Sequence, residues 1–390
     1  MVSRSLIAWS STLLKSTSTT SSSSTAASTI AVAAINALDH APLTGLFAVN
    51  KPTGITSTTI LDHLQHICKR NQTHPLVKGV LAVDKSKRAL KRGLVKIGHG
   101  GTLDPLARGI VVVGMGTGCK KLNNMSGSSK VYIAEARLGV SSTTLDSTGS
   151  LVDQKPTDHI TKALLLDALQ AFKGEITQTP PLYSALNMDG KRLYDYAREG
   201  IPLPREIPSR KVQIYDLELL SYPDGGVTVP DPSLREFGFG VGHSEDTIVT
   251  DGGDVNTKNA TELSDVRQDD QYLNPNSFRP KKLADSTTTL DKPIPPPTSA
   301  TDKYFHIRVH CSSGTYIRTL IADIAARLGT VGLMTDLLRV EQSGYRLGGP
   351  ATIAMKECED LEAVQRAIDA GNLIWEKRNA KAGASQLAEE

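Results

Sequence analysis

The chain has few cysteines and no long apolar run, and both absences narrow the classes of protein to which it can belong. Its 390 residues include four cysteines, which lie far apart and form no Cys-x-x-Cys pair: Cys68, Cys119, Cys311 and Cys358. This spacing argues against a structural zinc site and indicates a reducing compartment. Because no run of about eighteen residues is apolar throughout, no membrane span is expected.

Two phosphate-binding signatures are missing or incomplete. The glycines at 98–101 are not followed by Gly-Lys-Ser/Thr, which excludes a P-loop there. The stretch Gly114–Gly118 has Gly-x-Gly spacing after an apolar run but lacks the third glycine in its proper place. The sequence therefore gives little support for a dinucleotide-binding loop.

Acidic residues are absent from the first 38 positions. Arg4 and Lys15 are the only charged residues in that segment, and serine and threonine crowd positions 10–29. This composition is typical of a mitochondrial transit peptide, and a plain disordered tail is the alternative. We expect residues 1–40 to form a disordered leader with a targeting role.

The net charge of +3 conceals an uneven distribution. Fourteen acidic and seven basic residues lie between Asp224 and Asp302, so the remainder of the chain carries +10. The acidic stretch is rich in Gly, Pro, Asp and Thr, which predicts a disordered insertion over 223–302. A second insertion, 73–96, is basic. A basic remainder with core-like patterning is typical of a protein that binds a polyanion.

Apolar periodicity predicts one α/β domain built from residues 41–222 and 303–376, followed by a tail at 377–390. The strands 211–220 and 304–310 are expected to pair as neighbours across the acidic insertion. The helix over 315–328 can be capped at its start by Ser312, Ser313 or Thr315 and at its end by Gly329. The other strands are expected at 43–50, 110–113, 132–139 and 331–345, and the other helices at 56–70, 161–172 and 358–370.

The stretch Gly98–Gly109 is the most informative one in the chain, because it places one carboxylate in a stiff loop. Its glycines allow backbone angles and close approaches that other residues cannot make. Pro105 fixes its own φ and pushes Asp104 toward extended geometry. The apolar run 110–113 follows directly. The pattern therefore predicts Asp104 at the edge of a buried strand, a suitable position for a catalytic group, although most such loops are plain turns.

Several motifs in one order over about 300 residues resemble those of the TruB-type tRNA pseudouridine(55) synthase family, in particular a eukaryotic, fungal-like, stand-alone member. The catalytic motif of that family resembles Gly98–Gly109. The other matching segments are Asn50–Gly54, Lys130–Tyr132 with Ala136–Gly139, Tyr183–Leu186 with Gly190–Arg198, Cys311–Thr319 and Leu337–Arg339.

The resemblance implies the pseudouridine synthase catalytic fold, a mixed and mainly antiparallel sheet flanked by helices. It makes Asp104 the catalytic carboxylate, whether this group attacks the ring, attacks the sugar or abstracts a proton. Arg318 is its implied partner, because a fixed guanidinium can hold a carboxylate charged and oriented. Tyr132 would stack on the extruded uracil, His99 would lie beside the flipped nucleotide, and Leu337 would wall the base.

The family's substrate is RNA, so basic residues near these motifs are candidates for RNA binding. We expect no C-terminal PUA domain of the kind that bacterial members append, and the basic insertion is expected to take over part of its role. Asn187 stands where the family usually has lysine, which puts any charge contact at that position in doubt. The RNA-binding candidates are Lys51, Lys85, Lys87, Arg88, Lys91, Arg92, Lys120, Lys121 and Arg339.

The expected activity is isomerisation of uridine to pseudouridine in the T-loop of tRNA after base flipping, with no metal and no cofactor. The enzyme is expected to act as a monomer on the T-arm, with some messenger RNA as a further substrate, in the mitochondrion and in the nucleus or cytoplasm. Two alternatives stay open. One is a tRNA-binding or tRNA-folding protein whose catalysis is dispensable, and the other is a guide-RNA-dependent synthase of the same family.

Overall fold

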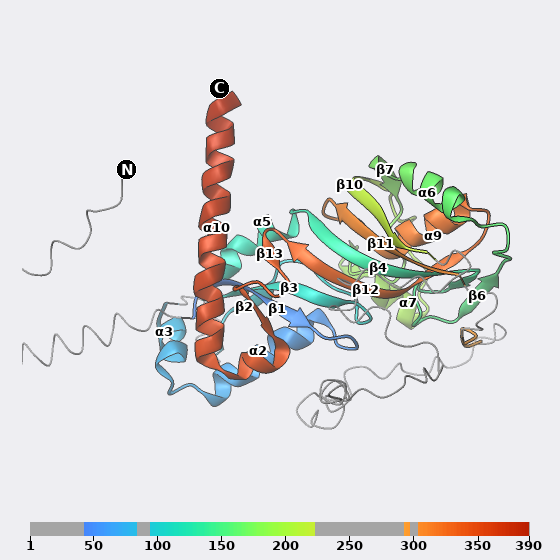
Figure 1. Cartoon of the computed structure of the whole chain (residues 1–390). Helices are drawn as coiled ribbons and strands as arrows, with labels where there is room; N and C mark the ends of the chain where they lie inside the picture. Colours follow the sequence, from blue (N-terminus) through green and yellow to red (C-terminus); the bar gives the residue numbers. More distant parts are fainter. Residues whose placement is uncertain (1–42, 84–93, 223–291, 297–302, 390) are drawn as a thin grey trace, which may run out of the picture. The chain divides into compact units, whose positions relative to one another are not determined.

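A ten-stranded sheet forms the centre of the computed structural model, which describes residues 43–83, 94–222, 292–296 and 303–389. The main strand order is β14-β1-β3-β12-β4-β11-β10-β7, with β13 paired to β12 and β2 paired to β3. Figure 1 shows this sheet and the helices around it. The strands are β1 Gly45–Lys51, β2 Ile97–His99, β3 Arg108–Met115, β4 Lys130–Leu138, β7 Gly174–Gln178, β10 Arg210–Ser221, β11 Tyr304–Cys311, β12 Gly332–Gln342, β13 Tyr345–Arg346 and β14 Thr352–Ala354.

The sheet is mixed and mainly antiparallel, as expected from the sequence. Among the described strands, only the β1–β14 and β3–β12 pairs are parallel. Strands β10 and β11 pair in antiparallel fashion, so the parts of the chain on both sides of the acidic insertion belong to one sheet. Two short hairpins lie outside it: β5 Val140–Ser142 with β6 Leu151–Gln154, and β8 Asn187–Met188 with β9 Lys191–Arg192.

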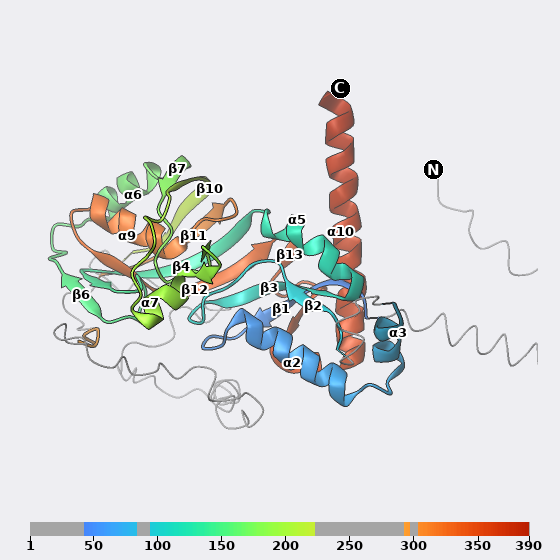
Figure 2. The same cartoon turned by 180° about the vertical axis from the view of Figure 1, so that it is seen from behind.

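Helices pack on both faces of the sheet and bury apolar side chains against it, except for α7, which packs on the β8–β9 hairpin. In α2, Ile60, Leu64 and Ile67 are buried, and the Thr56 hydroxyl accepts a hydrogen bond from the Thr59 N–H at the helix start. Figure 2 shows α2 below β1 and β3, with α6 and α9 at the other end of the sheet. The helices are α2 Ser57–Arg70, α3 Pro75–Val83, α5 Leu122–Ser126, α6 Lys162–Gln170, α7 Leu193–Glu199, α9 Ile317–Arg327 and α10 Leu361–Glu389, with 3-10 turns η1 Gly116–Lys121 and η4 Met355–Glu359.

Helix α9 confirms the helix predicted over 315–328 but corrects its N-terminal cap. Its N-cap residue is Tyr316, whose side chain makes no capping bond, and the Gln178 amide oxygen accepts from the Tyr316 N–H instead. The prediction for the other end is confirmed, because Gly329 adopts a φ of +74° directly after the helix. A residue from β7 thus replaces the local serine or threonine cap.

The insertion at 73–96 is only partly a charged surface. Its first half forms α3, which buries Leu76, Val77 and Val80 in the main core while Lys78 stays exposed. The cations Lys85, Lys87, Arg88, Lys91 and Arg92 lie outside the described residues, as do the leader 1–40 and most of the acidic insertion 223–302. The predicted roles of these segments stay predictions.

The closing helix α10 is longer than predicted. It begins at Leu361 and runs to Glu389, through the predicted tail 377–390. Its first half packs on β1, where Gly371 comes so close that an added Cβ would lie 1.8 Å from the Leu46 carbonyl oxygen. Figure 1 shows the second half projecting past the strands.

The Gly371→Ala substitution should therefore destabilise the protein, by about 1–3 kcal/mol, because it forces α10 off β1. An exposed helical Gly→Ala change would instead stabilise by about 1 kcal/mol. Urea unfolding measures the difference. Gly127→Ala is the matched control, since an added Cβ there meets nothing within 4 Å. A stability equal to or above that of the parent would show that α10 does not approach β1 this closely.

Candidate active site

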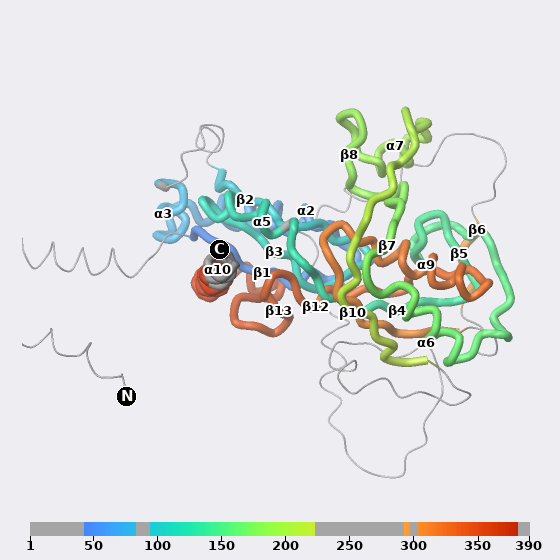
Figure 3. Tube along the Cα trace, turned by 90° about the horizontal axis from the view of Figure 1, so that it is seen from above, coloured from blue at the N-terminus to red at the C-terminus, as the bar shows by residue number. Residues whose placement is uncertain are grey.

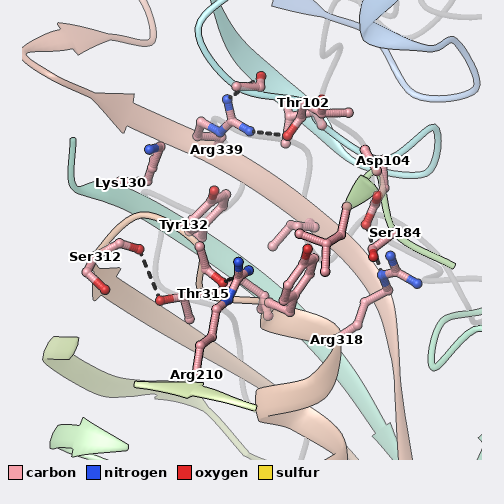
Figure 4. Close-up of a pocket in the computed structure, with 18 residues that line it drawn as sticks. Thr102, Asp104, Lys130, Tyr132, Ser184, Arg210, Ser312, Thr315, Arg318 and Arg339 are labelled. Atoms are coloured by element: carbon pink, nitrogen blue, oxygen red, sulfur yellow. Dashed lines mark hydrogen bonds and ion pairs between the residues drawn. The ribbon is translucent and has the colours of Figure 1, made fainter. Parts of the chain in front are cut away.

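A pocket of about 340 Å³ opens beside the Asp104 loop, and side chains from distant segments converge on it. Strands β4 and β12, the start of α9, the segment before β8 and the start of β10 all contribute residues (Figure 4). The charged and polar side chains at the pocket are those of Thr102, Asp104, Lys130, Tyr132, Ser184, Arg210, Ser312, Thr315, Tyr316, Arg318 and Arg339.

Asp104 and Arg318 form an ion pair at the pocket, as the sequence predicts. The Arg318 Nε lies 2.9 Å from the Asp104 Oδ2. The guanidinium also donates to the Thr144 and Tyr183 carbonyl oxygens, at 2.6 and 2.9 Å. The Arg318 side chain is 4% exposed, whereas that of Asp104 keeps 34% exposure toward the pocket. Arg318 is thus fixed in the protein, while the carboxylate it holds stays accessible to a substrate.

A second carboxylate, Asp146, lies beside this pair and was missed by the sequence analysis. Its Oδ2 is 3.7 Å from the Arg318 Nε, and its side chain is 6% exposed. The Asp146 Oδ1 accepts from the Thr148 N–H at 3.0 Å and from the Thr144 and Thr148 hydroxyls. The donors lie two residues before and two residues after Asp146, so its own turn holds the carboxylate in place. No motif in the sequence separates it from an ordinary turn aspartate.

The environment raises the pKa of Asp104 above its ordinary value. Removal of water by the surrounding protein is the main cause, Arg318 opposes it, and the negative charge of Asp146 adds to the rise. If Asp104 must be ionised for the reaction, the enzyme will lose activity on acidification. That loss will occur at a higher pH than it would with an aspartate of ordinary pKa.

The Asp146→Asn substitution should move that acid limb to lower pH. Loss of the Asp146 charge lowers the pKa of Asp104, so the carboxylate stays ionised further into acid. The pH profile of kcat/KM measures the shift, and thermal unfolding checks that the variant is folded. Asp153→Asn, an exposed change in β6, should leave the limb in place. An unmoved or raised limb in Asp146→Asn would contradict this electrostatic account.

Two buried cations hold the Asp104 loop in place, and one of them corrects a prediction made from the sequence. Lys51, predicted to contact RNA, is fully buried, and its Nζ donates to the Pro52, Ile55 and Pro105 carbonyl oxygens at 2.9, 2.8 and 3.3 Å. Burial lowers the pKa of Lys51 to about 8. Lys51 therefore ties the start of α2 to the Asp104 loop and has no surface to offer to RNA.

Arg339, a further candidate for RNA contact, is 1% exposed and lines the pocket, and its contact with RNA stays a prediction. Its guanidinium donates to the Thr102 and Ile110 carbonyl oxygens at 2.9 and 3.2 Å and to the Gln342 side chain at 2.9 Å. Gly109 lets the backbone of β12 lie this close to β3, since an added Cβ would lie 2.3 Å from the Arg339 carbonyl oxygen. Arg339 thus joins β12 to the loop and forms part of the pocket floor.

Tyr132 and Leu337 line the pocket, as the resemblance implies. Tyr132 is 7% exposed, and the Arg339 guanidinium carbon lies 5.6 Å from its ring centre. Burial raises the pKa of the Tyr132 hydroxyl, which keeps it neutral and able to donate or accept a hydrogen bond. Leu337 is 5% exposed and supplies an apolar wall. The pocket thus pairs an aromatic face with an aliphatic one, a suitable slot for a planar base.

His99 does not line the pocket. It lies in β2, half-buried, where its Nδ1 accepts from the Gly101 N–H at 3.4 Å. Burial and then the charge of Arg339 lower its pKa. Its predicted place beside a flipped nucleotide stays a prediction.

Among the pocket residues to which the sequence assigned no role are Lys130, Ser184 and Arg210. The Lys130 Nζ donates to the Ser128 carbonyl oxygen at 2.6 Å, and burial followed by the charge of Arg339 lowers its pKa to about 8. Ser184 is 3% exposed, and its hydroxyl has no partner among the described residues. Lys130 and Ser184 belong to two of the motifs that resemble those of the family, so the motifs could have indicated both as candidate site residues.

Asn187, where the family usually has lysine, has a structural role at the β8–β9 turn. Its side-chain oxygen accepts from the Gly190 N–H at 3.0 Å. This turn belongs to a segment that carries β8, β9 and α7 and extends away from the sheet (Figure 3). In the described part of the chain, no group of three or more His, Cys, Asp or Glu residues could hold a metal ion. No described helix is long and apolar enough to cross a membrane.

Comparison with known proteins identifies the class that this sheet and this pocket represent. Residues 87–248 match the family described as TruB family pseudouridylate synthase (N terminal domain). The tRNA pseudouridine synthase 4 of Saccharomyces cerevisiae is 37% identical over 331 residues, which cover 78% of each chain. The chain therefore belongs to the TruB family of pseudouridine synthases.

Further relatives lie in eukaryotes and bacteria. The tRNA pseudouridine synthase 4 of Schizosaccharomyces pombe is 37% identical over 336 residues, covering 78% of this chain and 79% of the relative. The human pseudouridylate synthase TRUB1 is 42% identical over 180 residues, covering 46% and 49%. A solved structure described as a Cbf5-Nop10-Gar1 complex aligns with a TM-score of 0.42 at 17% identity, covering 83% of this chain and 59% of that chain.

Proposed function

We propose that this protein isomerises uridine to pseudouridine in tRNA, at position 55 of the T-loop. The observation that carries the proposal is the Asp104–Arg318 pair, in which a fixed, buried guanidinium holds an accessible carboxylate in a pocket with an aromatic wall. Membership of the TruB family supports the reaction class, and the names of the yeast relatives support tRNA as the substrate.

The reaction breaks the C1′–N1 bond, turns the uracil and joins C5 to C1′. The base loses a proton from C5 and gains one at N1, so the step needs no oxidant, no reductant and no added group. Asp104 supplies the ionised carboxylate beside the sugar. Arg318 stabilises this charged form, from which attack on the ring, attack on the sugar and proton abstraction all start. The Tyr132 ring lies where it can stack on the detached base, and its neutral hydroxyl is a candidate for relaying the C5 proton, which it can take up only as it passes its own proton to another acceptor.

The uridine must leave its stack to reach this pocket, which costs a few kcal/mol. A T-loop is bent and partly single-stranded, so its bases are more easily extruded than those of a duplex. A base extruded from such a loop can enter a pocket that has one aromatic wall, Tyr132, and one aliphatic wall, Leu337.

Purified protein and an unmodified tRNA transcript test the proposal. We expect one pseudouridine to form, at position 55, without added metal or cofactor, and we expect none in a transcript that carries cytidine at that position. Modification elsewhere would overturn the assignment of the site. Formation only when a second RNA and further proteins are added would favour the guide-RNA-dependent alternative, and tRNA refolding without pseudouridine would favour a tRNA-folding protein.

We further propose that the enzyme acts as a monomer, accepts some messenger RNA stem–loops, and works in the mitochondrion and in the nucleus or cytoplasm. The leader without acidic residues supports mitochondrial import. A fusion of residues 1–40 to a fluorescent protein should enter mitochondria, and a diffuse cytosolic signal would contradict this. Light scattering of the purified protein and pseudouridine mapping in messenger RNA, with and without the enzyme, test the other two proposals.

A further inference from the structure

Four cations outside the pocket gather where η1 meets α10, and the mechanism above uses none of them. Lys120 and Lys121 end η1, and Lys377 and Arg378 lie on the second half of α10. Lys120 and Lys377 are exposed, and Lys121 and Arg378 are half-buried. We name these four residues the η1–α10 cation strip. Figure 2 shows α5, the short helix that follows η1, next to α10.

Packing fixes the half-buried members of the strip. The Lys121 Nζ lies 5.4 Å from the centre of the Trp375 ring, and an Arg378 Nη1 lies 3.8 Å from the Met125 Sδ. Trp375 and Met125 belong to the same apolar cluster, which α5 and α10 share on one face of β1 and β3. The fold therefore holds the Lys121 ammonium and the Arg378 guanidinium at defined positions, each through its own apolar neighbour.

Carboxylates neutralise several other surface cations of the protein but none of these four. Among the residues that the structure describes, no ion pair joins any member of the strip to an acidic side chain. By contrast, Arg366, three turns earlier on α10, pairs with Asp360 at 3.5 Å, and Lys211 on β10 pairs with Glu175 at 2.8 Å. The strip thus keeps its positive charge for an external anion.

The strip adjoins the catalytic loop through Met125. The Met125 carbonyl oxygen accepts from the Gln342 amide at 3.1 Å, and the same amide donates to Gly100 at the start of the Asp104 loop. The charge of Arg378 also helps to lower the pKa of Lys130, which lines the pocket. Arg378 on α10 therefore lies within electrostatic reach of a cation that lines the pocket.

We propose that the η1–α10 cation strip binds backbone phosphates of the same RNA molecule whose uridine occupies the catalytic pocket. An RNA with one nucleotide in the pocket must run across the protein surface beside it, and cations without carboxylate partners are the groups that bind phosphates there. The contacts are to the backbone, so they add affinity and orientation without reading the base sequence. The inference rests on the proposed function and assigns α10 a role in holding its substrate.

The double substitution Lys377→Glu and Arg378→Glu tests the proposal. We expect the Kd for full-length tRNA to rise about tenfold or more near 0.1 M KCl, because two favourable charges become repulsive. The slope of log Kd against log salt should fall by about two, roughly one for each phosphate that the variant no longer binds. The weaker binding should appear as a rise in KM that exceeds any fall in kcat, since the strip holds RNA away from the reacting atoms.

Arg366→Glu is the matched control. It makes the same cation-to-Glu substitution on the same helix, at one position instead of two, and at a residue paired with Asp360, so the Kd should stay within about twofold of the parent. Circular dichroism and thermal unfolding check that the variants are folded. If the Glu substitutions disturb α10, a second double variant, Lys120→Gln with Lys377→Gln, removes two charges of the strip without reversing them. That variant should lower the salt slope in the same direction.

A parental Kd and a parental salt slope in a folded double variant would overturn the inference, as would an equal weakening of binding in Arg366→Glu. This failure differs from a failure of the proposed function. If the strip alone is wrong, the parent and the double variant both form pseudouridine with the same KM. If the function is wrong, the parent forms none, and the Kd measurements still report whether α10 binds RNA.

Discussion

Asp104→Asn is expected to reduce pseudouridine formation by at least about a thousandfold while the protein still folds and binds tRNA. The amide has nearly the shape of the carboxylate but no charge, and it can neither attack carbon nor take a proton, whichever of these steps the enzyme uses. Arg318 keeps a charged neighbour in this variant, because Asp146 remains 3.7 Å away. Single-turnover assays with tRNA in excess of Kd measure the loss.

Asp153→Asn serves as the control for that experiment, since Asp153 lies half-exposed in β6 and pairs only loosely with Lys155, at 4.0 Å. It should keep the parental rate. Binding of tRNA by Asp104→Asn, at a Kd within a few-fold of the parent, separates a catalytic loss from a loss of affinity. If the variant modified tRNA at the parental rate, Asp104 would not be the catalytic group and the proposed mechanism would be wrong.

The second large effect is expected for Arg318→Met, which should both destabilise the fold and abolish activity. The substitution leaves Asp104 and Asp146 close together without a cation, and the Thr144 and Tyr183 carbonyl oxygens lose their donor. Breaking a buried pair in this way costs about 3–5 kcal/mol, and we expect a value near 3 because Asp104 is partly exposed to the pocket. Urea unfolding with an unchanged m-value measures the loss.

The destabilisation by Arg318→Met should grow with pH. Removal of the cation raises the folded-state pKa of Asp104 further above its unfolded value, since Arg318 is the group that lowers it. A group with a raised pKa loses stability as the pH rises past its unfolded value, so the loss at pH 7.5 should exceed that at pH 5. Arg318→Lys keeps the charge and should recover part of the stability. Equal losses at both pH values would indicate that only packing was removed.

The positions of the six longest strands of the main sheet and of helices α2, α6, α9 and α10, together with the Asp104–Arg318 ion pair, could be predicted from the sequence. Strand and helix positions follow from local apolar periodicity, as at β1, α2 and the β10–β11 pair. Asp104 was found because glycines and a proline confine it within a few neighbouring residues. Arg318 was found through its motif, since nothing in the helix over 315–328 shows by itself which loop its side chain meets.

Only the tertiary structure decided which charges are buried and what they contact. Lys51 and Arg339 are cations in motifs that resemble those of the family, and both are buried and hold the Asp104 loop through backbone carbonyl groups. Arg339 and Thr102 are 237 positions apart in the chain, so their contact depends on how β12 packs beside β3. The same applies to Asp146 beside Arg318 and to Arg378 beside Met125. Burial and charge pairing depend on long-range packing, which local sequence patterns do not encode.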